Sequence, residues 1–195
     1  MQLIAVRTYD SPLGALVLAA DDAGLLGAWF EGQKHFGRAG GALLVEEGSG
    51  CPAMSGSAKL AGEAGPAVAT AAESIARAHL DAARTWLDTY FTGRDSGDLP
   101  SLHFMGSPFQ RAVWDELAAI SYGQTTTYGA IAVALETRFG RSTSARAVGG
   151  AVGRNPVSII VPCHRVLGAN GAITGYAGGL DRKRALLALE GIDLP

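Results

Sequence analysis

The sequence predicts an α+β N-terminal domain, about 1–97, followed by a mostly α-helical C-terminal domain, about 98–195. Three observations support this prediction. The first thirty residues alternate short apolar runs with turn signals, which is typical of an antiparallel sheet. One long amphipathic segment follows at 67–91. Residues 107–153 then hold three short segments that begin near capping residues, which favours consecutive helices.

Length and composition exclude several classes of protein. A chain of 195 residues is long enough for one medium domain or two small ones. Apolar residues make up 48% and charged residues 17%, which predicts a folded chain. No apolar run approaches the roughly 18 residues of a membrane span, and the first residues lack the pattern of a secretory signal. Two cysteines cannot form a disulfide framework, so we expect a cytoplasmic protein in which Cys51 is an exposed spectator.

The N-terminal domain is expected to contain a three-stranded meander and one long helix. Its strands are separated by Asp-Ser-Pro-Leu-Gly and Asp-Asp-Ala-Gly turns and are expected at 3–8, 13–19 and 25–30. Gly, Ala and Ser dominate 37–66 without a clear period, which predicts a surface loop or an insertion. Pro66 suits the first turn of the helix at 67–91, and the turn-rich stretch 93–100 provides a linker.

In the C-terminal domain, Ser107 can cap the first helix, where Pro108 fits the first position and Gln110 can complete a capping box. A second helix is expected at 128–136 and a third at about 144–153. The expected caps of these two helices are Thr127 for the second and Ser142 or Thr143 for the third. Two short helices joined by a turn, the second rich in small residues, resemble a helix-turn-helix.

Charge is distributed unevenly along the chain. Residues 1–100 hold seven Lys and Arg against twelve Asp and Glu, whereas residues 101–195 hold nine against six. Within 117–180 there are five arginines and one acidic residue, Glu136. Such a segment suggests a localised anionic ligand, first of all DNA or RNA, and a chance fluctuation in an arginine-rich composition explains it equally well.

The pair Cys163-His164 carries the most chemical information. It follows the apolar run 157–161, which predicts a short buried strand, and it precedes a Gly-rich loop and a final helix at 181–190. A thiol of pKa about 8.5 is mostly protonated at neutral pH, so a nucleophilic cysteine needs a base. His164 can be that base, directly or through a water, with Glu190 orienting its ring. On spacing alone, a buried structural cysteine beside a satisfied histidine is the commoner arrangement.

Adjacent Cys and His side chains do not readily ligate one ion together, so we expect no metal. The string Pro162-Cys163-His164-Arg165-Val166 lies within a set of ordered segments, at 145–150, 155–156, 159–166, 175–179 and 189–191. This set resembles the O6-alkylguanine-DNA alkyltransferases, also called methylated-DNA–protein-cysteine methyltransferases. The resemblance is dense over about 104–192, and it extends more weakly to 10–14 and 32–34.

The resemblance implies both a fold and an activity. The first domain is expected to be a small antiparallel sheet with helices, ribonuclease H-like, and the second to carry a winged helix-turn-helix-like DNA-binding element. Members of the family transfer an alkyl group irreversibly from O6-alkylguanine in duplex DNA, and more weakly from O4-alkylthymine, to a cysteine. The implied partner is duplex DNA that contains O6-alkylguanine, bound by a monomer that can cluster on DNA and has no membrane contact.

The resemblance also implies a role for each catalytic residue. Cys163 accepts the alkyl group, His164 deprotonates it through a water, and Glu190 orients the imidazole. Tyr128 matches the tyrosine that donates to guanine N3, and Arg146 matches the arginine finger that replaces the flipped base. Without the resemblance, Tyr128 is an ordinary amphipathic residue at a helix start and Arg146 a phosphate contact.

Further positions follow from the same resemblance. The DNA-binding residues beside the finger are Thr127, Ala145, Ala147, Gly149, Gly150 and Arg154. The base pocket and its support are formed by Asn155, Val166, Tyr176, Ala177 and Gly178. The glycines let the third helix approach the DNA minor groove closely, and tight helix packing is the competing explanation for them.

The sequence differs from the family at two places, and it leaves two alternative functions to be considered. Ala177 stands where some relatives carry serine, and the segment 136–144 is longer than usual and adds Arg138 and Arg141. One alternative is a protein that recognises alkylated DNA without transfer, which the presence of Cys163 argues against. The other is a cysteine hydrolase with a Cys-His-Glu relay, which leaves the arginine-bearing helix pair without a purpose.

Overall fold

The computed structural model describes residues 4–39, 42–43 and 70–193. A three-stranded antiparallel sheet in the order β1-β2-β3 forms the centre of the N-terminal part. The strands of this part are β1 (Ala5–Ser11), β2 (Gly14–Ala20), β3 (Leu25–Phe30), β4 (Arg38–Ala39) and β5 (Ala42–Leu43). The elements that follow are α1 (Ala71–Tyr90), α2 (Pro108–Ala118), β6 (Thr126–Thr127), α3 (Tyr128–Phe139), α4 (Ala145–Val152), β7 (Val166–Leu167) and α5 (Leu180–Leu189).

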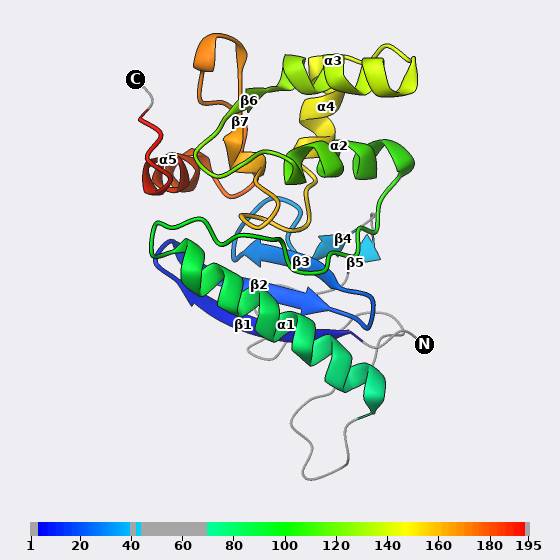
Figure 1. The fold of residues 1–195 in the computed structure, drawn as a ribbon, viewed down its shortest axis with the longest axis vertical. Helices are drawn as coiled ribbons and strands as arrows, with labels where there is room; N and C mark the ends of the chain where they lie inside the picture. Colours follow the sequence, from blue (N-terminus) through cyan, green and yellow to red (C-terminus); the bar gives the residue numbers. More distant parts are fainter. Residues whose placement is uncertain (1–3, 40–41, 44–69, 194–195) are drawn as a thin grey trace.

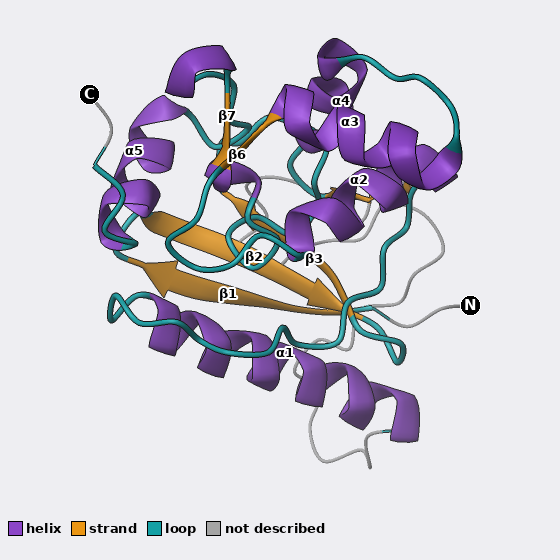
Figure 2. Cartoon of the chain, turned by 45° about the horizontal axis from the view of Figure 1, so that its top comes forward, coloured by secondary structure: helices purple, strands orange, loops and turns teal. Residues whose placement is uncertain are grey.

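Helix α1 covers one face of the sheet, and the C-terminal helices lie beside its edge strand β3 (Figures 1 and 2). Leu80, Ala83 and Leu87 recur at helical spacing along α1 and are buried. They share a core with Leu16 and Leu18, which alternate along β2 toward the same side. Burial of these apolar faces is the main force that holds α1 on the sheet.

Segments of the C-terminal half form backbone hydrogen bonds with the edge of β3 that no other strand of the sheet occupies. The Ala28 N–H donates to the carbonyl of Pro156 at 2.9 Å, and the Ala28 carbonyl accepts from the Ser158 N–H at 2.8 Å. Leu25 forms a similar pair of hydrogen bonds with the segment 101–103. One hydrophobic cluster runs from α1 and the sheet into α2, α3 and α4. The two halves of the chain are therefore joined by backbone hydrogen bonds and a shared core.

Side-chain capping fixes the starts of α2, α3 and α4, whereas α5 begins after Gly179 without a side-chain cap. Ser107 and Gln110 form the predicted capping box on α2, and Thr127 caps α3 as predicted. Helix α4 is capped by Ser144, so the prediction of Ser142 or Thr143 is wrong by one or two residues. The caps of α2 and α3 could be predicted from sequence because a cap is a local interaction that needs no tertiary contact.

The predicted strand at 157–161 is not present. This segment is a buried turn with one isolated bridge, between Ala28 and Val157, and Ile159 has a φ of 71°. The Asn155 side chain accepts from the Val157 N–H at 3.1 Å and donates to the carbonyl of Val161 at 2.8 Å. These bonds close the turn, and the apolar run is buried by the core and not by sheet partners.

Two loops also differ from expectation. Within 37–66, the described residues include the antiparallel pair of short strands β4 and β5, and 40–41 and 44–66, with Cys51, lie outside the described residues. Helix α3 continues beyond the expected 136 to Phe139 and ends at Gly140, which has a φ of 64°. Residues 137–139 therefore belong to α3, and the connection to α4 comprises 140–144.

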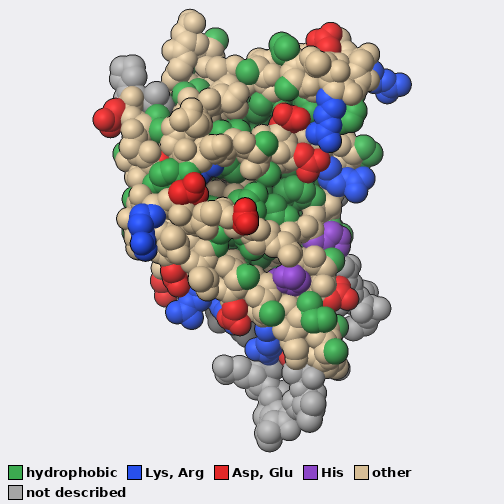
Figure 3. All heavy atoms as spheres, in the orientation of Figure 1, with side chains coloured by type: hydrophobic (Ala, Val, Ile, Leu, Met, Phe, Trp, Pro, Cys, Tyr) green, Lys and Arg blue, Asp and Glu red, His purple; other side chains and the backbone are tan. Residues whose placement is uncertain are grey.

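Acidic and basic side chains are intermixed over the face seen in Figure 3. Arg138 near the end of α3 pairs with Glu116 of α2 at 3.4 Å. Among the helices that the structure describes, none is long and apolar enough to cross a membrane.

Candidate active site

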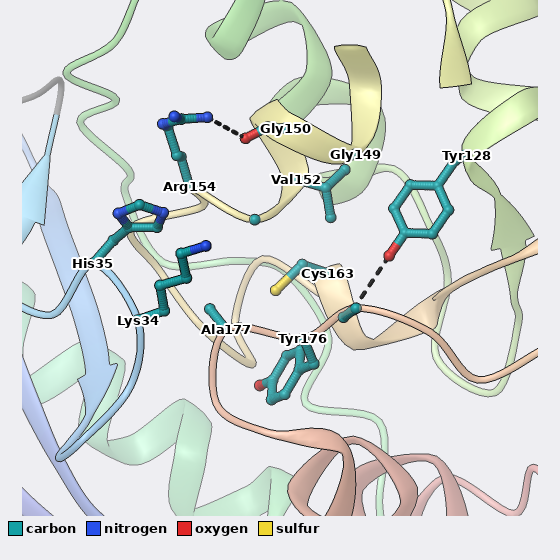
Figure 4. A pocket seen from close by; sticks show the side chains of 12 residues that line it. Lys34, His35, Tyr128, Gly149, Gly150, Val152, Arg154, Cys163, Tyr176 and Ala177 are labelled. Carbon is teal, nitrogen blue, oxygen red and sulfur yellow. Dashed lines mark hydrogen bonds between the residues drawn. The ribbon is translucent and has the colours of Figure 1, made fainter. Parts of the chain in front are cut away.

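Cys163 is buried at the floor of a pocket of about 310 Å³. It begins a short 3₁₀ turn, Cys163–Arg165, that follows the buried turn at 157–161. Its sulfur points toward the space between α4 and the loop that carries Tyr176 and Ala177 (Figure 4). A thiol in this position can be reached by a group that enters the pocket, whereas most of its surface is shielded.

The pocket walls come from both halves of the chain. Its lining residues are Lys34, His35, Tyr128, Gly149, Gly150, Val152, Gly153, Arg154, Cys163, Gly175, Tyr176 and Ala177. The Lys34 N–H donates to the carbonyl of Ala177 at 3.0 Å, which ties the N-terminal wall to the C-terminal loop. Lys34 and His35 lie on one side of the sulfur and Tyr128 on the other (Figure 4).

His164, which follows Cys163 directly in the chain, forms a buried pair with Glu190. The distance from His164 Nε2 to Glu190 Oε1 is 2.7 Å, and neither side chain has exposed surface. Since a carboxylate only accepts, Nε2 carries the proton and donates it to Glu190. Among the described residues, His164 Nδ1 is buried without a hydrogen-bond partner. Nδ1 is therefore the ring nitrogen that is free to accept a proton.

Glu190 is held as a carboxylate by several donors. Arg165 Nε donates to Oε2 at 2.8 Å and Arg165 Nη2 to Oε1 at 3.1 Å. The backbone N–H of Gly123 adds a bond to Oε2 at 3.2 Å. Burial alone raises the pKa of Glu190, but the hydrogen bonds and charges of His164 and Arg165 outweigh burial and lower it to about 2. The group that faces His164 is thus negative at every physiological pH.

The cysteine and the histidine are both neutral at rest. Burial raises the pKa of Cys163, and a hydrogen bond from Asn155 and the charge of Lys183 offset only part of that rise. Burial also lowers the pKa of His164, against the opposing effect of Glu190. The resting state is a thiol beside a neutral imidazole, so the proton has to leave sulfur when a substrate reacts.

The residues that the sequence predicts for the pocket divide into two groups. Asn155 is buried and braces the turn that leads to Cys163, and Tyr176 and Ala177 line the pocket. Val166 and Gly178 do not line it. Val166 is fully buried, and a Cβ on Gly178 would come within 2.8 Å of the Tyr176 ring, so this glycine permits close packing.

Tyr128 and three of the residues predicted to bind DNA line the pocket. The Tyr128 hydroxyl is 3.2 Å from the carbonyl oxygens of Thr174 and Gly175 and donates to this loop. Gly149, Gly150 and Arg154 line the pocket, and Arg154 Nη1 donates to the Gly150 carbonyl at 2.9 Å. The residues predicted to bind DNA that do not line the pocket are Thr127, which caps α3, and Ala145, Arg146 and Ala147, which begin α4. Of these four, Thr127 is partly buried and the other three are exposed.

Comparison with known proteins decides the family. Residues 108–192 match the family described as "6-O-methylguanine DNA methyltransferase, DNA binding domain". A methylated-DNA–protein-cysteine methyltransferase of Mycobacterium leprae is 37% identical over 188 residues, which cover 96% of this chain and 93% of that protein. The chain belongs to this methyltransferase family.

Other members show how the similarity is distributed. A methylated-DNA–protein-cysteine methyltransferase of Mycolicibacterium paratuberculosis is 53% identical over 104 residues, which cover 53% of this chain and 61% of that protein. The chain thus spans about three fifths of the length of this relative. The crystal structure of Mycobacterium tuberculosis OGT in complex with DNA is similar over 95% of this chain and 92% of that one, with a TM-score of 0.66 and 35% identity.

Sequence reasoning on this methyltransferase-family chain missed several residues at the site. Lys34 and His35 line the pocket from the N-terminal half, and Arg165 holds Glu190. Lys183 is fully buried, and its Nζ donates to the carbonyls of Val166, Thr174 (2.7 Å) and Gly175 (3.3 Å). A signal for Lys183 was available, because it lies three and four residues before buried leucines on α5.

Replacing Lys183 with methionine is expected to lower the free energy of unfolding by about 2–4 kcal/mol. Methionine keeps the length of the side chain but leaves three carbonyl groups near the pocket without this donor. Arg184→Met on the exposed side of the same helix is the control and should change stability by less than about 0.5 kcal/mol. Urea denaturation of both variants measures the difference, and equal midpoints would contradict the role of Lys183.

Proposed function

We propose that this protein repairs alkylated DNA by irreversible transfer of an alkyl group from O6-alkylguanine to Cys163. The observation that carries the proposal is the buried thiol at the floor of a pocket, next to a His164–Glu190 pair whose free ring nitrogen is Nδ1. The names of the relatives, which are methylated-DNA–protein-cysteine methyltransferases, support methyl as the principal group. O4-alkylthymine is proposed as a weaker substrate.

The proposed step balances without a cofactor. Sγ of Cys163 attacks the alkyl carbon, an S–C bond forms, and the bond from carbon to guanine O6 breaks. The thiol proton passes to His164 Nδ1, directly or through a water, and Glu190 stabilises the resulting imidazolium. The electron pair of the broken bond stays with guanine, where a hydrogen bond donated by the Tyr128 hydroxyl to N3 offsets the negative charge until guanine takes up a proton from solvent. Because the thioether is stable, each chain reacts once.

DNA is proposed to approach along α4. The sulfur lies at the floor of a pocket, so the alkylated nucleotide has to leave the duplex stack to reach it. A Cβ on Gly149 or Gly150 would meet its nearest neighbours at 3.7 Å, an ordinary contact, so helix packing does not require these glycines. Their absence of side chain instead suits a close approach of the duplex, with Arg146 in the gap left by the flipped base.

The finer features of the fold are proposed on the same basis. We propose domains at about 1–97 and 98–195, the first ribonuclease H-like and the second with a winged helix-turn-helix-like element formed around α3 and α4. The remaining DNA contacts are proposed for Thr127, Ala145, Ala147 and Arg154. Asn155, with its hydrogen bonds around the active-site turn, is proposed to couple α4 to Cys163.

Intact mass spectrometry tests the function. The protein is mixed with a duplex that contains a single O6-methylguanine, and the product is digested and mapped. The expected result is a gain of one methylene group per chain, confined to Cys163. Tight binding without a mass change would favour lesion recognition without transfer, and turnover of an ester substrate would favour a cysteine hydrolase.

Replacing Arg146 with alanine is expected to slow methyl transfer from duplex DNA roughly tenfold to a hundredfold, because the extrahelical nucleotide loses its replacement in the stack. Transfer from free O6-methylguanine base should be unchanged, since no duplex has to open. Binding should keep most of its salt dependence, which other arginines carry. Single-turnover rates with both substrates check this prediction, with Arg184→Ala as the control. Equal losses on both substrates would place Arg146 in the chemistry instead.

A further inference from the structure

Tyr90 brings a hydroxyl group from the N-terminal half into the catalytic pair. It is the last residue of α1, and its side chain is fully buried. Its hydroxyl donates to Glu190 Oε1 at 2.7 Å and lies 3.3 Å from His164 Nε2. Glu190 Oε1 therefore accepts from the tyrosine and the histidine together.

Aromatic packing fixes the position of this hydroxyl. The Tyr90 ring stacks on Trp86 with 5.4 Å between ring centroids and an interplanar angle of 11°. Phe91 and Tyr122 contact the ring edge-on, at centroid distances of 5.4 and 6.2 Å. The ring cannot move away without disturbing this cluster. The hydroxyl is therefore held beside Glu190 Oε1 and His164 Nε2.

We propose that Tyr90 is a positioning residue for alkyl transfer, which holds Glu190 Oε1 against His164 Nε2 and thereby fixes the orientation of the imidazole that accepts the thiol proton in the proposed step. The inference rests on the proposed function. It assigns to α1, and so to the N-terminal half, a direct part in the reactivity of a cysteine that lies in the C-terminal half.

The charges around His164 give this role a measurable signature. The charged groups that act on the imidazole are Glu190, Arg165 and Lys183, and the phenol of Tyr90 lies beside its Nε2. Burial, followed by the charge of Glu190, raises the pKa of Tyr90 far above its usual value, so the phenol remains a donor throughout the assay range. Without that donor, the negative charge of Glu190 attracts an imidazolium more strongly.

The test is Tyr90→Phe in the full chain, with Tyr122→Phe as the matched control. Tyr122 lies in the same aromatic cluster, but its hydroxyl donates to the carbonyl of Leu189 at 3.1 Å and not to Glu190. Single-turnover methyl transfer from a duplex with one O6-methylguanine is measured from about pH 5 to about pH 8. Melting temperature and duplex affinity are measured in parallel.

For Tyr90→Phe we expect about a tenfold lower rate at neutral pH and an acid limb displaced to higher pH, with duplex affinity unchanged. Tyr122→Phe should match the wild type in rate and in pH profile. A Tyr90→Phe profile that coincides with the wild type, or a uniform loss at every pH that follows a lower melting temperature, would overturn the inference alone. Absence of transfer by the wild-type chain would instead overturn the proposed function, and the inference with it.

Discussion

Replacing Cys163 with serine is expected to abolish methyl transfer from O6-methylguanine, with no mass gain after incubations that take the wild-type chain to completion. A serine hydroxyl is a much weaker acid than a thiol, and its oxygen is a poorer nucleophile toward a saturated carbon. The neutral imidazole of His164 cannot remove its proton to a useful extent. Serine is nearly isosteric, so the pocket and the α4 surface stay intact and duplex binding should remain.

The measurement combines intact mass spectrometry with a binding assay on the same duplex. Cys51→Ser, which removes the other cysteine of the sequence, should transfer the methyl group at the wild-type rate. Transfer by Cys163→Ser, or labelling of Cys51 in the wild type, would show that another group is the acceptor. Loss of duplex binding in Cys163→Ser would indicate that the substitution disturbs the pocket.

Replacing Glu190 with glutamine is expected to slow methyl transfer at least about a hundredfold and to destabilise the fold by about 3–5 kcal/mol. The imidazolium that forms on His164 loses its counter-charge, which slows the reaction. Arg165 keeps its buried charge but loses the carboxylate that it contacts with two nitrogens, which costs stability. Glu116→Gln is the control, because its exposed pair with Arg138 contributes less than about 1 kcal/mol.

The stability difference between wild type and Glu190→Gln should depend on pH in a defined direction. The pKa of Glu190 is about 2 in the folded protein and near its ordinary value of 4.5 when the chain is unfolded. The carboxylate therefore stabilises the fold fully above about pH 5, and this contribution is lost as pH falls through the folded pKa. Urea denaturation at several pH values from 7 to about 2 should show the difference narrowing. A constant difference would mean that the Glu190 charge is not stabilised by folding.

Local interactions explain which predictions from sequence held. The capping box of Ser107 and Gln110 and the cap at Thr127 depend on residues three apart, so the sequence alone specifies them. The prediction of a strand at 157–161 was wrong because the same apolar sequence pattern occurs in buried turns and in buried strands. The closing of that turn depends on the side chain of Asn155, whose partners no periodicity reveals.

The sequence by itself determined the family resemblance and the adjacency of Cys163 and His164, because both depend on the order of residues along the chain. Only the tertiary structure decided that Tyr90 reaches Glu190 across 100 positions and that Lys34 lines the same pocket as Cys163. The tertiary structure also sets the protonation states of the site, because burial raises the pKa of Cys163 and the pairing with His164 and Arg165 lowers the pKa of Glu190. Nucleophile and base are encoded locally, whereas solvent exclusion and charge pairing arise when distant segments pack into one core.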